Sequence, residues 1–323
     1  MAGAVMAEVS STVRSLPAGA DSQGAARTLA APGRPLSQSR TPQGWLDLQR
    51  WRGSAALLPA LLFLGAFFLL PLLGLLLRGF TEPQPGLGNY AQLFANAAYA
   101  RVLFNTFAVA TLVTLISVLL AFPLAWVITL VPRGWGRLVL NIVLLSMWTS
   151  LLARTYSWLV LLQGSGVINS LLMSLGLIDE PLEMVNNLTG VVIGMSYIML
   201  PFIVLPLQAT MQALDPMVLQ AGAICGASPW VNFWRVFLPL CRPGLFSGGL
   251  MVFVMSLGYY VTPALLGGAQ NMMLPEFIIQ QVQSFLNWGL ASAAAALLVL
   301  LTLVLFYLYL KLQPESPVGA GGK

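Results

Sequence analysis

The sequence predicts an all-α protein that crosses a membrane six times. Hydrophobic residues make up 58% of the 323 residues and charged residues only 8%, whereas a soluble domain carries roughly a quarter charged residues. A chain of this composition cannot cover a water-facing surface, so most of it must lie in lipid. Helices are favoured over strands because unpaired backbone groups are costly in lipid, and the apolar runs are too long for barrel strands.

The chain starts with a polar tail and continues with six apolar runs. Residues 1–52 are rich in Ala, Gly, Ser, Pro, Gln and Arg and show no apolar periodicity, which is typical of disorder. A cleaved signal peptide is not expected, because the first apolar run begins only near residue 55 and is too long. The runs that reach the roughly 20 residues of a spanning helix are 55–77, 102–128, 138–162, 188–207, 245–263 and 290–310. We therefore predict a membrane domain over 53–312 and a second tail over 313–323.

The basic residues predict the orientation of these spans. If the N-terminus is cytoplasmic, the cytoplasmic side receives most of the arginines, among them Arg133, Arg137 and Arg235, and both lysines. The opposite side receives only Arg78 and Arg101 near the membrane. Cytoplasmic loops of membrane proteins carry an excess of Lys and Arg, so both termini and the loop between the fourth and fifth spans are predicted to be cytoplasmic.

Several chemistries are excluded by residues that the chain lacks. It has no histidine, and neither of its two lysines, Lys311 and Lys323, follows a glycine-rich turn. The chain therefore has neither the phosphate-binding loop of an ATPase nor a Ser-His-Asp triad. Cys225 and Cys241 have no histidine partners and make a poor zinc site, so we expect no metal and no cofactor. The net charge of +5 comes from scattered arginines, so no nucleic-acid partner is expected.

The loop between the fourth and fifth spans carries the clearest local signals. Asp215 before a proline is typical of a helix start, and Gly226 can take the left-handed conformation that ends a helix. Ser228, again before a proline, repeats the start signal, and Pro239 is expected to end the second helix. The sequence therefore predicts two short helices joined at a glycine, with aromatic side chains on the second that can anchor the pair. An alternative is that both helices lie at the membrane interface without a partner.

The stretch "LDPMVLQAGAICGASPWVNFWRVFLPLCRPGL" resembles the cytoplasmic EAA loop of ABC-importer membrane subunits, in which an E-A-A triplet is followed by a glycine and then by an apolar-Leu-Pro sequence. In that family the loop forms a coupling helix that docks on the ATP-binding subunit. The resemblance implies coupling roles for Asp215, Leu219, Gln220, Ala221, Gly222 and Gly226. Gln220 replaces the usual Glu and Gly222 the usual Ala. A charged contact to the ATPase is therefore expected to be weaker here, although glutamine can still form hydrogen bonds.

The resemblance extends over about residues 57–310. The stretches "RTYSWLVLLQGSGVINSLLMSLGLIDEPLEMV", "YIMLPFIVLPLQATMQALD" and "LGYYVTPALLGG" are similar to the first permease of spermidine/putrescine-type importers. This implies a non-enzymatic subunit of a bacterial inner (plasma) membrane that forms half of a pathway for a small molecule. The implied partners are two copies of an ATP-binding subunit, a second permease, a periplasmic or lipoprotein solute-binding protein, and membrane lipid. Tyr259 stands where a polyamine permease is expected to have an acidic residue, which leaves the substrate open.

Three residues are candidates for the translocation pathway. Arg154 is the only charged residue within a predicted span, and inserting an arginine at mid-bilayer costs roughly 2.5–3.5 kcal/mol. One interpretation is structural: the side chain reaches the interface or binds a backbone carbonyl. The other is that it lines the pathway. Tyr259 and Tyr260 either attract an amine through their aromatic faces or belong to an interfacial aromatic belt. The acidic loop around Asp179 is predicted to include a short helix at the membrane surface. This loop either receives the binding protein or is only solvated.

Two other function classes fit the sequence less well. An intramembrane hydrolase needs a buried His or Lys, or carboxylates within spans, and the sequence has neither. An ion-coupled secondary transporter of a small solute is the alternative function; that class usually carries buried acidic residues and internal repeats. Within the importer class, amino-acid derivatives, phosphonates and ferric iron remain alternative substrates to polyamines.

Overall fold

The computed structural model describes residues 57–312, and in this part of the chain six helices are long and apolar enough to cross a membrane. They are Leu57–Thr81, Ala97–Leu130, Leu151–Ser174, Leu188–Ala213, Pro229–Leu257 and Trp288–Tyr307. The predicted all-α class with six spans is thereby confirmed. The predicted tails, 1–52 and 313–323, lie outside the described residues.

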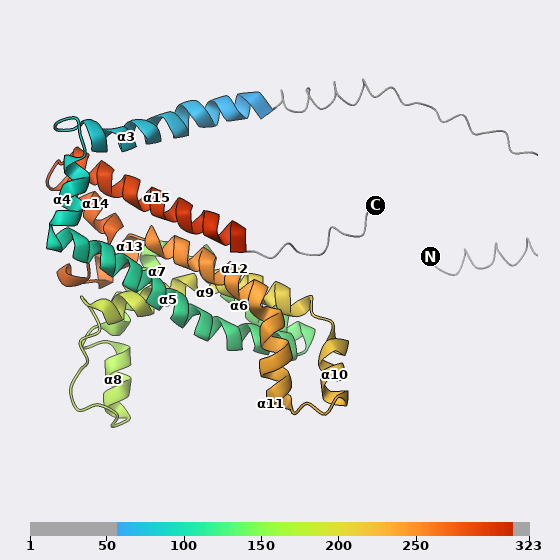
Figure 1. Cartoon of the computed structure of the whole chain (residues 1–323). Helices are drawn as coiled ribbons and strands as arrows, with labels where there is room; N and C mark the ends of the chain where they lie inside the picture. The colour runs from blue at the N-terminus through green and yellow to red at the C-terminus, as the bar shows by residue number, and fades with distance from the viewer. Residues whose placement is uncertain (1–56, 313–323) are drawn as a thin grey trace, which may run out of the picture. The chain divides into compact units, whose positions relative to one another are not determined.

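The chain divides into two units, Met1–Gly65 and Ala66–Lys323, and the contacts given below belong to the second. The π-helical segment η2 (Gly65–Leu69) lies at the boundary. The elements that follow (Figure 1) are α3 (Leu70–Thr81), α4 (Gly88–Ala95), α5 (Ala97–Leu130), α6 (Arg133–Trp148), α7 (Leu151–Leu162), α8 (Val167–Ser174), α9 (Leu188–Gln212), α10 (Pro216–Ile224), α11 (Pro229–Asn232), the π-helical η3 (Phe233–Phe237), α12 (Leu238–Leu257), α13 (Val261–Leu266), the 3-10 turn η4 (Ala269–Asn271), α14 (Leu274–Gln283) and α15 (Trp288–Leu312).

The core is formed by α5, α9 and α12, which pack along one another. Its buried side chains include Val113 from α5, Met199 from α9 and Val252 from α12. Small residues let the backbones approach closely: a Cβ atom added at Gly248 would lie 3.0 Å from the Cα atom of Ile203. In lipid, where helices gain little from burial of apolar surface, such close packing is a main source of association.

A second cluster joins α3, α4, α14 and α15. The pair α3 and α15 meets at Gly79, where an added Cβ atom would lie only 2.9 Å from the backbone nitrogen of Ala293. Leu93, Phe277 and Leu290 pack together at this place. The cluster lies at the end of the molecule opposite α10 and α11 (Figure 1).

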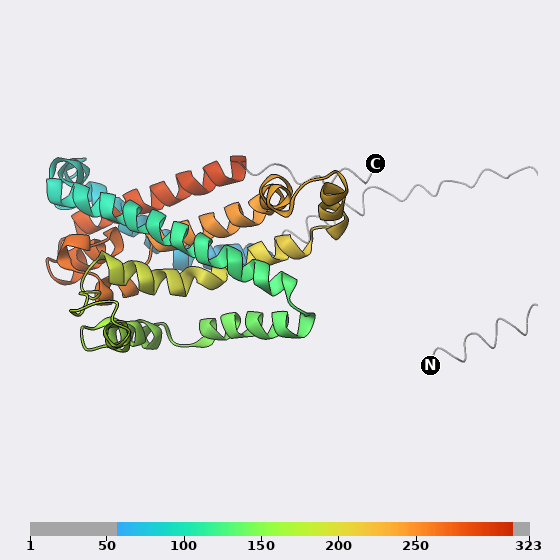
Figure 2. The same cartoon turned by 90° about the horizontal axis from the view of Figure 1, so that it is seen from below.

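The prediction of one continuous third helix over 138–162 is wrong. The structure has two helices here, α6 and α7, which follow one another along one side of the molecule with a break between them (Figure 2). Thr149 and Ser150 have ψ angles of 149° and 134°, so the chain is extended at this point. The segment contains no Gly or Pro that would reveal the break. At the break, the side chain of Arg154, five residues further along the chain, donates a hydrogen bond to the carbonyl oxygen of Thr149 at 3.2 Å.

The fifth predicted span, 245–263, is displaced in the structure. Its main helix, α12, begins at Leu238 and ends at Leu257. The seven residues that precede the predicted run are therefore already helical. Gly258 caps α12, and a new short helix, α13, follows. The fifth span is thus also interrupted, and α13 lies beside α7.

Candidate functional site

Residues 215–238, called the coupling loop here after their predicted role, begin with the helix caps that the sequence predicts. The carboxylate of Asp215 accepts a hydrogen bond from the backbone N–H of Met217 at 2.9 Å. Gly226 has a φ angle of +83°, in the left-handed region that favours glycine. The hydroxyl of Ser228 accepts from the N–H of Val231 at 3.3 Å. The two predicted helix starts and the glycine turn are therefore confirmed.

The predicted end of the second helix at Pro239 is wrong. The chain remains helical from Pro229 to Leu257, through α11, η3 and α12. Proline normally clashes with the carbonyl four residues earlier and leaves that carbonyl without its N–H partner. Here the π-helical turn η3 precedes Leu238 and Pro239, and such a turn accommodates the proline because its hydrogen bonds run to the fifth residue. The loop is thus joined rigidly to the fifth span.

Aromatic side chains anchor the coupling loop to α5. The rings of Phe233 and Phe237 on η3 lie against Phe122 and Trp126 on α5, with centroid separations between 5.1 and 6.2 Å. Phe237 is buried. Aromatic pairs at such separations stabilise packing beyond the area that they bury. The loop is therefore packed against the second span and continuous with the fifth.

Asn232 links the two helices of the loop. Its side-chain amide donates to the carbonyl oxygen of Leu219 at 2.8 Å, and its Oδ1 atom faces Gly222: a Cβ atom added there would lie only 2.6 Å from it. Gly222, which departs from the Ala of the resembled family, leaves the space that this amide occupies. Leu219 and Gly222 therefore fix the angle of α10 and do not lie on its outer surface. The sequence patterns did not single out Asn232, because its role depends on how α10 folds back.

The outer face of α10 is exposed and largely apolar. Met217 is 70% exposed and Ile224 is 86% exposed, and Gln220 and Ala221 between them are also exposed. These four residues are spaced at positions i, i+3, i+4 and i+7, so they share one face. Gln220 and Ala221 were predicted coupling residues; Met217 and Ile224 were missed, although helical spacing alone would have identified them.

Arg154, Tyr259 and Thr262 form a polar cluster where the two interrupted spans meet. The hydroxyls of Thr155 on α7 and Thr262 on α13 lie 3.4 Å apart and are buried, and the buried hydroxyl of Tyr259 lies near Arg154 and Thr262. Arg154 binds the carbonyl oxygen of Thr149, as noted, and its buried Nε has no hydrogen-bond partner within residues 57–312. The structure therefore brings two of the three pathway candidates together. It also gives Arg154 a backbone carbonyl partner, as the structural interpretation of this residue expects.

Tyr260, the third pathway candidate, lies at the start of α13 and is 36% exposed. Near the other break, Trp148 is 88% exposed, and Thr149 and Ser150 are exposed as well. Exposed, non-helical backbone at membrane depth is tolerated only where protein or water covers it. The same requirement would apply to this break if it lies within the membrane.

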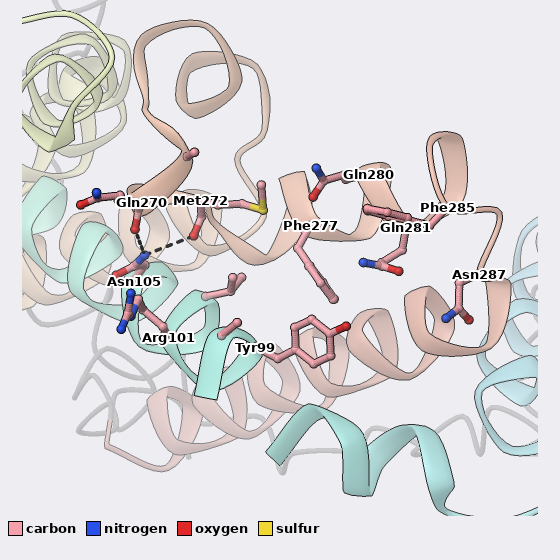
Figure 3. Close-up of a pocket in the computed structure, with 13 residues that line it drawn as sticks. Tyr99, Arg101, Asn105, Gln270, Met272, Phe277, Gln280, Gln281, Phe285 and Asn287 are labelled. Carbon is pink, nitrogen blue, oxygen red and sulfur yellow. Dashed lines mark hydrogen bonds between the residues drawn. The ribbon is translucent and has the colours of Figure 1, made fainter. Parts of the chain in front are cut away.

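A cavity of about 720 Å³ lies at the end opposite the coupling loop, between the start of α5 and the segment that includes η4 and α14. Figure 3 shows its polar lining: Arg101 and Asn105 come from α5, and amide side chains come from α14 and the loops beside it. The amide nitrogen of Asn105 donates to the carbonyl oxygens of Gln270 at 2.8 Å and Met272 at 3.5 Å. The wall is thus held by hydrogen bonds to a rigid helix. No sequence pattern had indicated this cavity.

Comparison with known proteins identifies the family. The family described as "Binding-protein-dependent transport system inner membrane component" matches residues 93–315. Spermidine/putrescine transport system permease protein PotB of Haemophilus influenzae is 34% identical over 207 residues, which cover 64% of this chain and 72% of that protein. Inner membrane ABC transporter permease protein YdcU of Escherichia coli is 36% identical over 234 residues, covering 65% of this chain and 74% of that protein.

The fold agrees with this result. A chain in the crystal structure of a bacterial ABC transporter involved in the import of the acidic polysaccharide alginate superposes with a TM-score of 0.68 at 20% identity, covering 84% of this chain and 100% of that chain. The family match includes α5, the interrupted third and fifth spans and the coupling loop. The chain therefore belongs to the family of inner-membrane components of binding-protein-dependent transport systems, as a multi-pass permease subunit that is not itself catalytic.

Proposed function

We propose that the chain forms half of the translocation pathway of an ATP-driven importer and that its substrate is a polyamine. The observation that carries the choice of substrate is the 34% identity to the spermidine/putrescine permease of H. influenzae. The alginate transporter supports the fold alone, because it is only 20% identical. Polyamines are small cations, and no described carboxylate lies within the spans, so aromatic faces are the proposed source of the attraction in this chain.

The coupling loop is the proposed contact with the ATP-binding subunit. Its exposed face presents Met217, Gln220, Ala221 and Ile224, while Leu219 and Gly222 hold the helix in place from the inside. A helix with apolar anchors at this spacing suits a hydrophobic groove on a partner. Closure of two ATP-binding subunits would then move α10, and the aromatic anchor would carry the movement into the second and fifth spans.

The proposed orientation follows from this contact. With the coupling loop in the cytoplasm, Arg133, Arg137 and Arg235 also lie on the cytoplasmic side and Arg101 on the outer side, in keeping with the excess of basic residues in cytoplasmic loops. Both termini are then cytoplasmic. The tails 1–52 and 313–323 are proposed to flank a membrane domain of 53–312.

The exposed break between α6 and α7 is proposed to face a second permease and the pathway between the two subunits. Arg154 repels cations, so its role is to hold the carbonyl end of α6 rather than to bind substrate. Tyr259 and Tyr260 lie at the neighbouring break in the fifth span, where an amine can approach an aromatic face; such contacts contribute about 0.5–2 kcal/mol. A solute-binding protein would deliver the substrate on the outer side; the solved alginate transporter has been captured with a periplasmic protein bound to an alginate pentasaccharide.

Uptake of radiolabelled spermidine into proteoliposomes tests the proposal. The full complex is reconstituted with its second permease, ATP-binding subunits and binding protein. Uptake is expected with ATP alone and not with a proton or sodium gradient alone; the reverse would establish the secondary-transporter alternative. Competition with amino-acid derivatives, phosphonates and ferric iron tests the substrate, and displacement of spermidine by any of these would contradict the polyamine assignment. Tyr259→Leu is expected to slow uptake, and Tyr259→Phe, which keeps the ring, is the matched control.

A further inference from the structure

The polar cluster between α7 and α13 contains buried hydrogen-bond donors that the described part of the chain leaves unused. The Nε atom of Arg154 and the hydroxyl of Tyr259 are both buried and have no hydrogen-bond partner there. The hydroxyl of Thr262 lies 3.4 Å from that of Thr155, further than the roughly 2.5–3.0 Å of ordinary O–H···O bonds. Thr155 itself donates to the carbonyl oxygen of Leu151 at 3.0 Å. Because buried donors are nearly always satisfied, the three groups together indicate an acceptor that comes from outside the described residues.

The charge of the cluster favours an anion over a water molecule as that acceptor. Arg154 forms no ion pair within residues 57–312, where the one ion pair joins Arg78 and Glu82. No described carboxylate lies within the six spans. A charge that is taken out of water without a counter-ion is costly, and a water molecule would accept a hydrogen bond without neutralising the guanidinium. An anion does both, through charge-assisted hydrogen bonds.

The cluster joins the two interrupted spans at the place where the substrate is proposed to pass. Arg154 belongs to α7, whereas Tyr259 and Thr262 lie on either side of the start of α13, just after the cap of α12 at Gly258. The helices α7 and α13 lie beside one another, and the hydroxyl of Tyr259 lies near both Arg154 and Thr262. Thr262 is fully buried, so a small ion fits this place better than an organic acid or a phosphate ester.

We propose that Arg154, Tyr259 and Thr262 bind a chloride ion, and that this ion supplies negative charge that attracts a polyamine to the pathway. The second part rests on the function proposed above, whereas the binding of the ion does not. The ion neutralises Arg154, which would otherwise repel the substrate. A cation that approaches the rings of Tyr259 and Tyr260 then meets an anion beside the guanidinium. The attraction is strong in a poorly hydrated site, because few water molecules screen it.

Thermal unfolding of the complete importer in nanodiscs of zwitterionic lipid tests the ion site without transport. Chloride replaces gluconate at constant ionic strength, and a ligand that binds the folded state raises the unfolding temperature. Wild type is expected to show this rise with chloride and with bromide. Tyr259→Phe and Thr262→Val each remove one donor and should need about tenfold more chloride for the same rise. Tyr156→Phe is the matched control, because Tyr156 also lies on α7 but is 54% exposed; it should respond like wild type.

ATP-driven uptake of spermidine into proteoliposomes tests the role of the ion. Wild-type uptake is expected to fall several-fold when gluconate replaces chloride. At saturating chloride, Tyr259→Phe should take up spermidine as fast as wild type, because its weaker site is then also filled. Tyr259→Glu places a fixed carboxylate near Arg154 in place of the ion, so its uptake should be the same in chloride and in gluconate.

Two results would overturn the ion site. One is an unfolding temperature that does not respond to chloride, as expected if a carboxylate of the second permease pairs with Arg154, or that responds equally in wild type and Tyr259→Phe. The other is a rise that appears only with anionic lipid, since a lipid phosphate would then bind Arg154. Chloride binding with equal wild-type uptake in chloride and gluconate would overturn the attraction of the substrate alone. If the wild-type importer binds chloride but takes up no spermidine with ATP, the proposed function is wrong and the ion site stands.

Discussion

Replacing Gly222 by alanine is the sharpest available test of how the coupling helix is positioned. The new methyl group would lie 2.6 Å from Oδ1 of Asn232, and ordinary contact begins at 3.4 Å, so the two atoms must separate by about 0.8 Å. Either α10 shifts, at the roughly 1–3 kcal/mol typical of overpacking, or the amide turns away. In the second case the 2.8 Å bond to the carbonyl of Leu219 is lost, which costs about 1 kcal/mol.

Hydrogen–deuterium exchange measures the outcome directly. A loss of about 1–3 kcal/mol should speed the exchange of the α10 amides roughly 5- to 150-fold, and less substrate should be moved for each ATP hydrolysed. Adding Asn232→Ala to Gly222→Ala removes the clash and should restore part of the coupling. Gly134→Ala on α6 is the matched control, because an added Cβ atom meets nothing within 4 Å there. Unchanged exchange and coupling in Gly222→Ala would refute the positioning role of this contact.

Three further predictions concern the rest of the chain. Partial burial raises the pKa of Glu276, so the folded state binds the carboxyl proton more tightly than the unfolded state does. Stability therefore falls as pH rises from the ordinary glutamate pKa to the raised value. Glu276→Gln should remove this pH dependence from the thermal unfolding temperature. Thr106→Val should lower the unfolding temperature, because the buried N–H of Leu274 loses its acceptor at about 1–3 kcal/mol, whereas Thr106→Ser should not. Arg154→Met should reduce both stability and uptake by removing the side-chain bond to the carbonyl of Thr149, and Arg154→Lys should retain part of each. Equal uptake in all three proteins would contradict that role.

The features that were predictable from sequence are those set by neighbouring residues. Asp215 and Ser228 cap helices through backbone groups two and three residues away, and Gly226 turns the chain by its own conformation. The six apolar runs likewise follow from composition, because lipid leaves a chain few alternatives to helix.

The features that were missed depend on backbone geometry and packing that the sequence patterns do not reveal. The break at Thr149 lies in a segment whose local propensity is helical, and the bond from Arg154 becomes visible only in three dimensions. Pro239 was misread because a π-helical turn before it accommodates the ring. No sequence pattern singles out Gln281, whose burial arises only when α14 packs against α5 and α15.

The most direct test of the central claim, that α10 docks on the ATP-binding subunit, uses a natural cysteine. Cys225 is exposed at the end of α10, whereas Cys241 is buried, so a photoactivatable thiol reagent can be attached at Cys225 in the purified importer, with Cys225→Ser as the control. We predict a covalent adduct with the ATP-binding subunit and slower thiol labelling of Cys225 when that subunit is present. Labelling at the same rate with and without the subunit, and no adduct, would contradict the account.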